Sequence, residues 1–167
     1  MDSTLPAYSY VPGGPWPHPG REAAQQGTPK PAVSAIEGDD WASSPLYLRG
    51  VTLFNAGYYW EAHEAWESLW HAHGRRGPTA DVLKGLIKLA AAGVKVRDRQ
   101  PHGVRIHGSR ASTLFEAVAS EHGTRLLGLA LIELAGHAAR IAEAPPEDPG
   151  TIDAAVSIVF NFRIETR

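Results

Sequence analysis

The segment from Phe54 to Trp70 limits the fold of this chain more than any other part of the sequence. It contains three of the five tryptophans, one histidine and three glutamates. Tyr59, His63, Trp66 and Trp70 recur within it at the spacing of one face of an α-helix. The pattern therefore predicts a helix whose aromatic stripe, with His63 on it, faces a hydrophobic core.

His63 and Glu67 are one helical turn apart in this segment. Side chains at this spacing are neighbours on a helix, with Cβ atoms about 6 Å apart. An imidazole and a carboxylate at that separation either share a metal ion or form a hydrogen bond. The residues that face them from other parts of the chain decide between the two.

Cysteine is absent from the 167 residues. This excludes disulfides, thiolate zinc sites, iron–sulfur clusters and a cysteine nucleophile, and leaves His, Asp and Glu as metal ligands.

The length of the chain fits one domain. No apolar run approaches the ~20 residues of a membrane span, and no signal-peptide pattern is found. We therefore expect a soluble, cytoplasmic protein that does not associate with membranes.

Composition divides the chain into three parts. Residues 1–44 are rich in proline and glycine and lack apolar periodicity, which predicts an N-terminal arm without regular elements. Aromatic residues such as Trp16 and Trp41 favour an arm that packs on its own domain or on a partner subunit. Residues 45–146 have helical periodicity, and residues 147–167 form an extended C-terminal arm.

About five helices are expected in residues 45–146, arranged as antiparallel hairpins in a compact all-α bundle. Their expected ranges are about 45–55, 58–72, 78–97, 101–120 and 124–144. Serine, proline and glycine at these boundaries are typical start and stop residues. Small residues at Gly85 and at 90–93 in the third helix allow another helix to approach closely.

Alternating apolar residues mark the C-terminal arm, at Val156, Ile158, Phe160, Phe162 and Ile164. A period of two indicates an extended segment. No second strand is evident in the sequence. We therefore expect this arm to lie along the helices or to pair with a symmetry-related copy.

Positive charge is concentrated between Arg75 and Arg110. This stretch has nine lysines and arginines against two aspartates, although the net charge of the chain is only −2. The simpler interpretation is that these residues pair with the acidic helix that carries Glu61, Glu64 and Glu67. The alternative is an anion site or a nucleic-acid surface. We favour the first, because no nucleic-acid motif appears and helical basic residues are usually solvated.

Two runs of residues form a recognisable pattern: Phe54-Asn55-x-Gly57-x-Tyr59-x-Glu61-Ala62-His63-Glu64-x-x-Glu67-x-x-Trp70 and Gly85-Leu86-Ile87-x-Leu89-Ala90-Ala91-Ala92. In these runs the chain resembles a bacterial and archaeal all-helical family, domain of unknown function 309. The resemblance covers about residues 45–120. It implies a compact helical domain whose His/Glu motif, here His63, Glu67 and Trp70, is suggested to bind metal. It implies no established activity. Lys88 stands where glutamine is expected in many members and would bring positive charge to the site.

The first functional hypothesis is a site for a divalent metal, Zn²⁺, Fe²⁺ or Mn²⁺. His63 and Glu67 supply two ligands from one helix. His107 is the best third ligand, because its spacing places it on the inward face of the fourth helix. The reserve ligands are His137, His18 and Glu64.

A hydrolytic reaction fits such a site. Glu64 would act as general base toward water, by analogy with the metal-binding helices of metalloproteases. The residues that we expect to contact a small anionic substrate are Lys84, Lys88, Trp70 and Tyr59. No cofactor other than the metal is expected.

The second hypothesis is a non-enzymatic helical adaptor or oligomeric scaffold, in which the pair His63 and Glu67 only ties the structure together. The sequence has no phosphate loop and no cofactor fingerprint, which agrees with this role. In either case we expect a homo-oligomer, most simply a dimer, that associates through the arms. Convergence of three ligands within ~2.0–2.2 Å of one point would distinguish the metal site from the scaffold.

Overall fold

The structure, a computed structural model, describes residues 4–20, 27 and 31–167. These residues form five α-helices, one 3₁₀ helix and one two-stranded hairpin. The helices are η1 (Trp41–Ser43), α2 (Pro45–Asn55), α3 (Tyr59–Ala72), α4 (Pro78–Arg97), α5 (Pro101–His122) and α6 (Leu131–Glu143). The expected all-α bundle is confirmed.

Most helix starts follow the local signals in the sequence. The Ser44 side chain accepts a hydrogen bond from the Tyr47 backbone N–H and caps α2, and proline occupies the first turn of α2, α4 and α5. Gly57 has a φ of 89°, a conformation that favours glycine. It allows α3 to begin a few residues after α2 ends.

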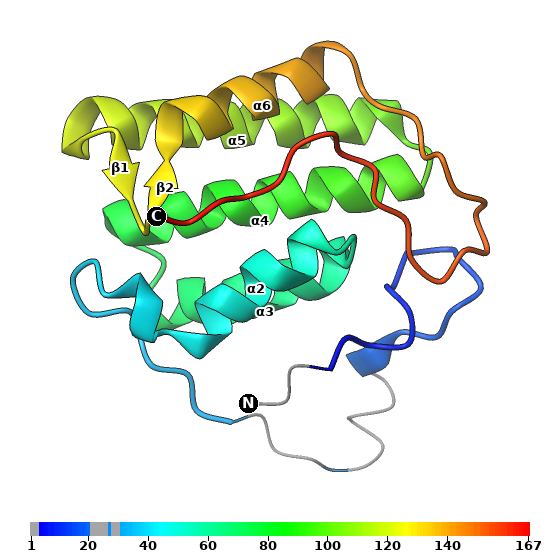
Figure 1. The fold of residues 1–167 in the computed structure, drawn as a ribbon, viewed down its shortest axis with the longest axis horizontal. Coiled ribbons are helices and arrows are strands. Elements are labelled where there is room, and N and C mark those ends of the chain that lie inside the picture. Colours follow the sequence, from blue (N-terminus) through cyan, green and yellow to red (C-terminus); the bar gives the residue numbers. More distant parts are fainter. Residues whose placement is uncertain (1–3, 21–26, 28–30) are drawn as a thin grey trace.

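Helix α4 lies in the middle of the bundle, between α3 and α5 (Figure 1). A Cβ atom added at Gly85 would lie 2.6 Å from the Phe115 ring of α5, and one added at Gly93 would lie 2.5 Å from the Tyr59 ring of α3. The expected close approach at these small residues is therefore confirmed on both sides of α4. α2 packs on α3 and α6 packs on α5, so each outer helix covers its sequence neighbour.

The expected start of the fifth helix, near residue 124, is wrong. Strands β1 (Arg125–Leu126) and β2 (Leu129–Ala130) form an antiparallel hairpin there, and α6 begins only after it. Leu127 and Gly128 have φ values of 54° and 71°, the signs that a tight two-residue hairpin turn requires. The Tyr47 hydroxyl donates to the Leu127 carbonyl at 2.8 Å, which stabilises a turn that leucine alone would not favour.

The described part of the N-terminal arm packs on its own domain. The Ser9 hydroxyl donates to the Glu61 carboxylate at 2.6 Å, and the backbone N–H of Tyr10 donates to the same carboxylate at 3.0 Å. The Ser9 backbone N–H donates to the carbonyl of Ala155 in the C-terminal arm. Expectations for residues 1–3, 21–26 and 28–30 lie outside the described residues.

The C-terminal arm lies along the helices and crosses the bundle over α4 (Figure 1). The Asn55 side chain accepts from the Ile164 backbone N–H and donates to the Ile164 carbonyl, both at 2.8 Å. The expected strict alternation is wrong in part: Ile158 is 54% exposed, whereas Val159 is buried. The Val159 backbone N–H donates to the Tyr59 hydroxyl, which fixes the arm in this register.

A buried ion pair connects this arm to α4. The Arg97 Nε atom lies 3.3 Å from the Asp148 carboxylate, and the two side chains are 2% and 0% exposed. Arg97 also donates to the carbonyl of Ala154 at 2.7 Å. Both arms are therefore held by polar contacts to a helix as well as by apolar packing.

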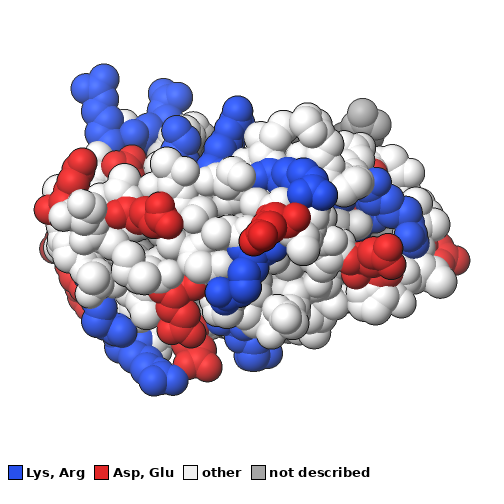
Figure 2. Space-filling view, turned by 90° about the horizontal axis from the view of Figure 1, so that it is seen from above, with Lys and Arg blue, Asp and Glu red and all other residues white. Residues whose placement is uncertain are grey.

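Among the described residues, no helix is long and apolar enough to span a membrane. On the face seen from above α5 and α6, positive and negative side chains are interspersed (Figure 2). That face offers no extended surface of one charge.

Candidate functional site

Helix α3 has a buried stripe and a partly exposed edge. Tyr59 and Trp66 are 2% and 0% exposed, and Ala62 and Leu69 complete the stripe. The His63 side chain is 26% exposed. The expectation that His63 faces the core is therefore wrong in detail: Ala62, one residue earlier, takes the buried position and turns His63 to the edge.

His63 contacts two carboxylates through its two ring nitrogens. Nε2 lies 3.3 Å from Glu67 Oε2, and Nδ1 lies 3.5 Å from Glu64 Oε1. One ligand atom from each of these three residues lies within 4.8 Å of the other two. We refer to His63, Glu64 and Glu67 as the His/Glu cluster. Within the described parts of the chain, it is the group of three that has the spacing of metal ligands.

His71 extends the cluster along α3, although the sequence assigned it no role. Its Nε2 atom lies 3.8 Å from Glu67 Oε1, and its side chain is 53% exposed. Glu67 is thus placed between an imidazole one turn before it and another one turn after it. The i, i+4 spacing of Glu67 and His71 is a signal that could have predicted this contact.

Lys88 brings positive charge to the cluster from α4. Burial lowers the pKa of Lys88, the charges of Arg110 and Lys84 lower it further, and Glu67 opposes this shift. Lys88 is therefore close enough to the cluster to interact with its carboxylate. Lys88 also lines a hollow together with Lys84 and Arg110, so it takes part in both the acidic edge of α3 and a basic surface.

His107 lies on α5 near this junction but does not complete the cluster. The group of ligand atoms within 4.8 Å of one another includes Glu64 instead. The Nδ1 atom of His107 is buried and has no hydrogen-bond partner among the described residues. As a third ligand His107 remains a prediction.

Trp70 is half-buried near the end of α3, and two cations approach its ring. The Lys84 Nζ atom lies 5.9 Å from the centre of the Trp70 ring, and the Arg75 guanidinium lies 5.8 Å from it. These distances fit cation–π interactions. The structure thus places Trp70, Lys84 and Lys88 near the edge that carries the cluster.

The other expected site residues lie elsewhere. Tyr59 is buried and holds the C-terminal arm, with its ring 5.2 Å from that of Phe160. The His18 ring packs edge-on against Trp60, at 5.1 Å, and its Nδ1 accepts a hydrogen bond from the Gly20 backbone. Neither side chain is placed to contact a ligand at the cluster.

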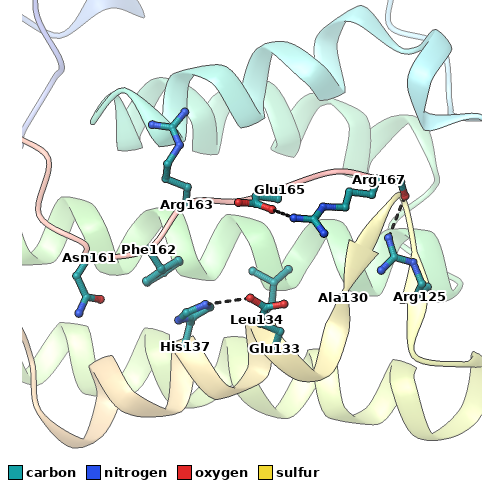
Figure 3. Close-up of a pocket in the computed structure, with 10 residues that line it drawn as sticks. All are labelled: Arg125, Ala130, Glu133, Leu134, His137, Asn161, Phe162, Arg163, Glu165 and Arg167. Carbon is teal, nitrogen blue, oxygen red and sulfur yellow. Dashed lines mark hydrogen bonds and ion pairs between the residues drawn. The ribbon is translucent and has the colours of Figure 1, made fainter.

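His137, the first of the reserve ligands, lines a hollow of about 350 Å³ between α6 and the C-terminal arm. Its ring stacks on Phe162 at 4.3 Å, and its Nε2 atom lies 3.8 Å from Glu133. Figure 3 shows that Arg167 pairs with Glu165 in the same hollow. Several charges of this hollow are thus balanced by neighbours within it.

One role of the segment from Phe54 to Trp70, the binding of the C-terminal arm, was not predicted from the sequence. Phe54, Asn55, Gly57 and Tyr59, which precede the cluster, bind the C-terminal arm: Phe54 lies 5.7 Å from the Phe160 ring, and a Cβ at Gly57 would lie 2.9 Å from the Ser157 carbonyl. Single-sequence patterns give no signal for contacts of this kind. The first half of the motif is structural, and the second half carries the candidate chemistry.

His107 provides a pH test of this region. Burial of the ring, followed by the charges of Lys88, Lys95 and Arg110, lowers the pKa of His107 from 6.5 to about 4. The unfolded chain then binds the proton more readily than the folded one, so folding stability falls as the pH drops from about 6.5 to about 4, with no further loss from this group below that range.

The measurement is the NMR titration of the His107 ring in the folded protein. We expect a midpoint near pH 4 in the wild type and a higher midpoint in Lys88→Met, because a repelling charge is removed. A wild-type midpoint near 6.5 that Lys88→Met leaves unchanged would contradict this placement of His107.

Residues 47–106 match the model of a family described as Domain of unknown function (DUF309). The match includes the whole His/Glu cluster, Lys84 and Lys88, and it ends one residue before His107. The expected resemblance is thereby confirmed for this segment. No curated protein matches the chain.

Proposed function

We propose that the His/Glu cluster binds a divalent metal ion and that the protein is a metal-dependent hydrolase of a small anionic substrate. The observation that carries this proposal is the approach of three ligand atoms, one each from His63, Glu64 and Glu67, to within 4.8 Å of one another. All three residues come from one helix, which holds them in a fixed relation.

The donor set suits the ions expected from the sequence. Two donor atoms that each lie about 2.0–2.2 Å from one ion are roughly 3.0–3.6 Å apart. The 3.3 Å between His63 Nε2 and Glu67 Oε2 falls in that range. One imidazole and one carboxylate, from His63 and Glu67, suit Zn²⁺, Fe²⁺ or Mn²⁺ and leave positions open for water and a substrate.

Each residue of the cluster, and Lys88 beside it, would have its own role in metal binding or hydrolysis. His63 and Glu67 would hold the ion, which would supply Lewis acidity to the bond that is cleaved. Glu64, at the other ring nitrogen of His63, would orient the imidazole or accept a proton from water. Lys88 would weaken the affinity for the ion and attract the anionic group of a substrate.

A non-enzymatic scaffold is the second candidate. The placement of the His63 ring between two carboxylates supports it, because such contacts also stabilise a helix without a metal. Association through the arms remains a prediction, although the described parts of both arms contact their own domain. A metal titration distinguishes the two candidates.

The titration measures the melting temperature with added Mn²⁺ or Zn²⁺. We expect a rise in the wild type, no rise in Glu67→Gln, and a wild-type rise in Glu116→Gln, an exposed glutamate on α5. Lys88→Met should bind the ion about threefold more tightly, because it removes a nearby positive charge. A scaffold in which the pair is only structural predicts no rise for any variant.

Hydrolysis is tested with p-nitrophenyl phosphate and p-nitrophenyl acetate in the presence of the ion that binds. Activity that is lost in Glu67→Gln and on addition of chelator would support the reaction class. Metal binding without turnover of either probe would keep the metal site and remove the support for a general hydrolase.

A further inference from the structure

A shallow hollow of about 330 Å³ lies between α4 and α5, beside the His/Glu cluster. Lys84 and Lys88 border it from α4, and Ser109, Arg110, Thr113 and Leu114 border it from α5. Lys88 connects it with the cluster, because this side chain interacts with both Glu67 and Arg110.

In the described part of the chain, the three cations of the hollow form no close ion pair within it, and the only acidic group that acts on Lys88 is Glu67 of the neighbouring cluster. No acidic residue lines it, and within the described residues Lys84, Lys88 and Arg110 form no salt bridge. The hollow beside α6 differs in this respect, because Arg167 there pairs with Glu165 (Figure 3). The described lining of the α4–α5 hollow thus carries three cations and no acidic residue.

The charges in this hollow repel one another. Lys88 and Lys84 are one turn apart on α4, and Arg110 faces them from α5. The lowered pKa of Lys88, caused by burial and then by Arg110 and Lys84, is the physical sign of this repulsion. A bound anion would relieve it, so the arrangement is complementary to negative charge.

The floor of the hollow is apolar. Leu114 is half-buried there, and the Thr113 methyl group and the carbon chains of the lysines add further apolar surface. A fully hydrated inorganic ion would leave this floor uncovered. A ligand with both an anionic group and an apolar body would use both parts of the surface.

We infer that the α4–α5 hollow binds an organic anion, in which a carboxylate, phosphate or sulfonate group is attached to an aliphatic or aromatic body. The anionic group lies among Lys84, Lys88 and Arg110, and the apolar body lies over Leu114. This inference deepens the proposed function, on which its link to catalysis rests, because it names the substrate class beside the His/Glu cluster. Binding of the anion itself requires no metal.

The test uses a fluorescent organic anion, 8-anilinonaphthalene-1-sulfonate, and its uncharged relative N-phenyl-1-naphthylamine. We expect saturable binding of the anion by the folded wild-type chain in chelator. The double variant Lys88→Met/Arg110→Met should bind it at least about tenfold more weakly, since it replaces two cations by apolar chains of similar length. Binding of the uncharged probe should be unchanged or stronger.

A matched variant controls for other sites. Arg163→Met removes an exposed cation from the hollow beside α6 and should change the dissociation constant of the anion less than about twofold. Octanoate and octyl phosphate should displace the probe, and octanol should not. Equal probe binding by the wild type and the double variant, or equal displacement by octanol, would overturn the inference.

The same experiment separates this inference from the metal site. His63→Ala should keep anion binding and lose metal binding, whereas Lys88→Met/Arg110→Met should lose anion binding and keep metal binding. Loss of the metal site alone would refute the proposed hydrolase and leave the anion site standing. Failure of the anionic probe to bind the wild type would refute the anion site and leave the metal site standing.

Discussion

Replacement of Asp148 by alanine is expected to lower the free energy of unfolding by about 3–5 kcal/mol. The carboxylate lies 3.3 Å from Arg97 Nε, and both side chains are almost fully buried. Asp148 also accepts a hydrogen bond from the Gly150 backbone N–H at 2.9 Å. Its removal would leave the Arg97 guanidinium buried without a counter-charge, which costs more than the pair itself contributes.

Urea unfolding of Asp148→Ala, followed by circular dichroism, measures this loss. The double variant Arg97→Met/Asp148→Leu should recover most of it, because neither member of the pair is then left buried without its partner. Glu165→Ala, which removes an exposed ion pair with Arg167, should change the stability by less than about 1 kcal/mol. A loss for Asp148→Ala as small as that of Glu165→Ala would show that the arm is not anchored by this pair.

Replacement of Gly50 by alanine is expected to lower the free energy of unfolding by about 2–3 kcal/mol. A Cβ atom at this position would lie 2.2 Å from Nε1 of Trp66, a side chain with no exposed surface. Trp66 Nε1 also donates to the Tyr47 carbonyl at 3.3 Å, so displacement of the indole would weaken this hydrogen bond. Gly50 is thus the position where α3 approaches the backbone of α2.

Gly136→Ala is the matched control, at a half-buried position of α6. The atom nearest to its added Cβ is the end of the flexible Arg140 side chain, at 3.3 Å. Alanine should therefore stabilise the protein there by roughly 0.5–1 kcal/mol through its higher helix propensity. If both glycine variants were equally stable in urea, close packing of α2 on α3 would be refuted.

Much of the helical framework could be predicted from the sequence, because it depends on local signals. Ser44 and Pro45 define the start of α2, and the small residues Gly85 and Gly93 mark the close contacts of α4. These features need no knowledge of distant residues. The hairpin at Leu127 and Gly128 was missed because it depends on a hydrogen bond from Tyr47, 80 residues earlier in the chain.

The same distinction applies to the site. His63 and Glu67 are local to one helix, and their spacing was sufficient to identify them as a pair, whereas Glu64 was expected only as a reserve ligand or a base. Arg110 was missed as a neighbour of Lys88, because their proximity depends on the packing of α4 against α5. Tyr59 was expected at a ligand but is buried, since single-sequence periodicity does not reveal that the C-terminal arm covers it.

Elemental analysis of the untagged protein tests the central claim most directly. The wild type and Glu116→Gln are dialysed without chelator after exposure to Zn²⁺, Fe²⁺ and Mn²⁺, in parallel with His63→Ala. The account predicts about one equivalent of ion per chain in the first two proteins and almost none in His63→Ala. Absence of metal from all three, or equal metal content in wild type and His63→Ala, would contradict a metal site at the His/Glu cluster.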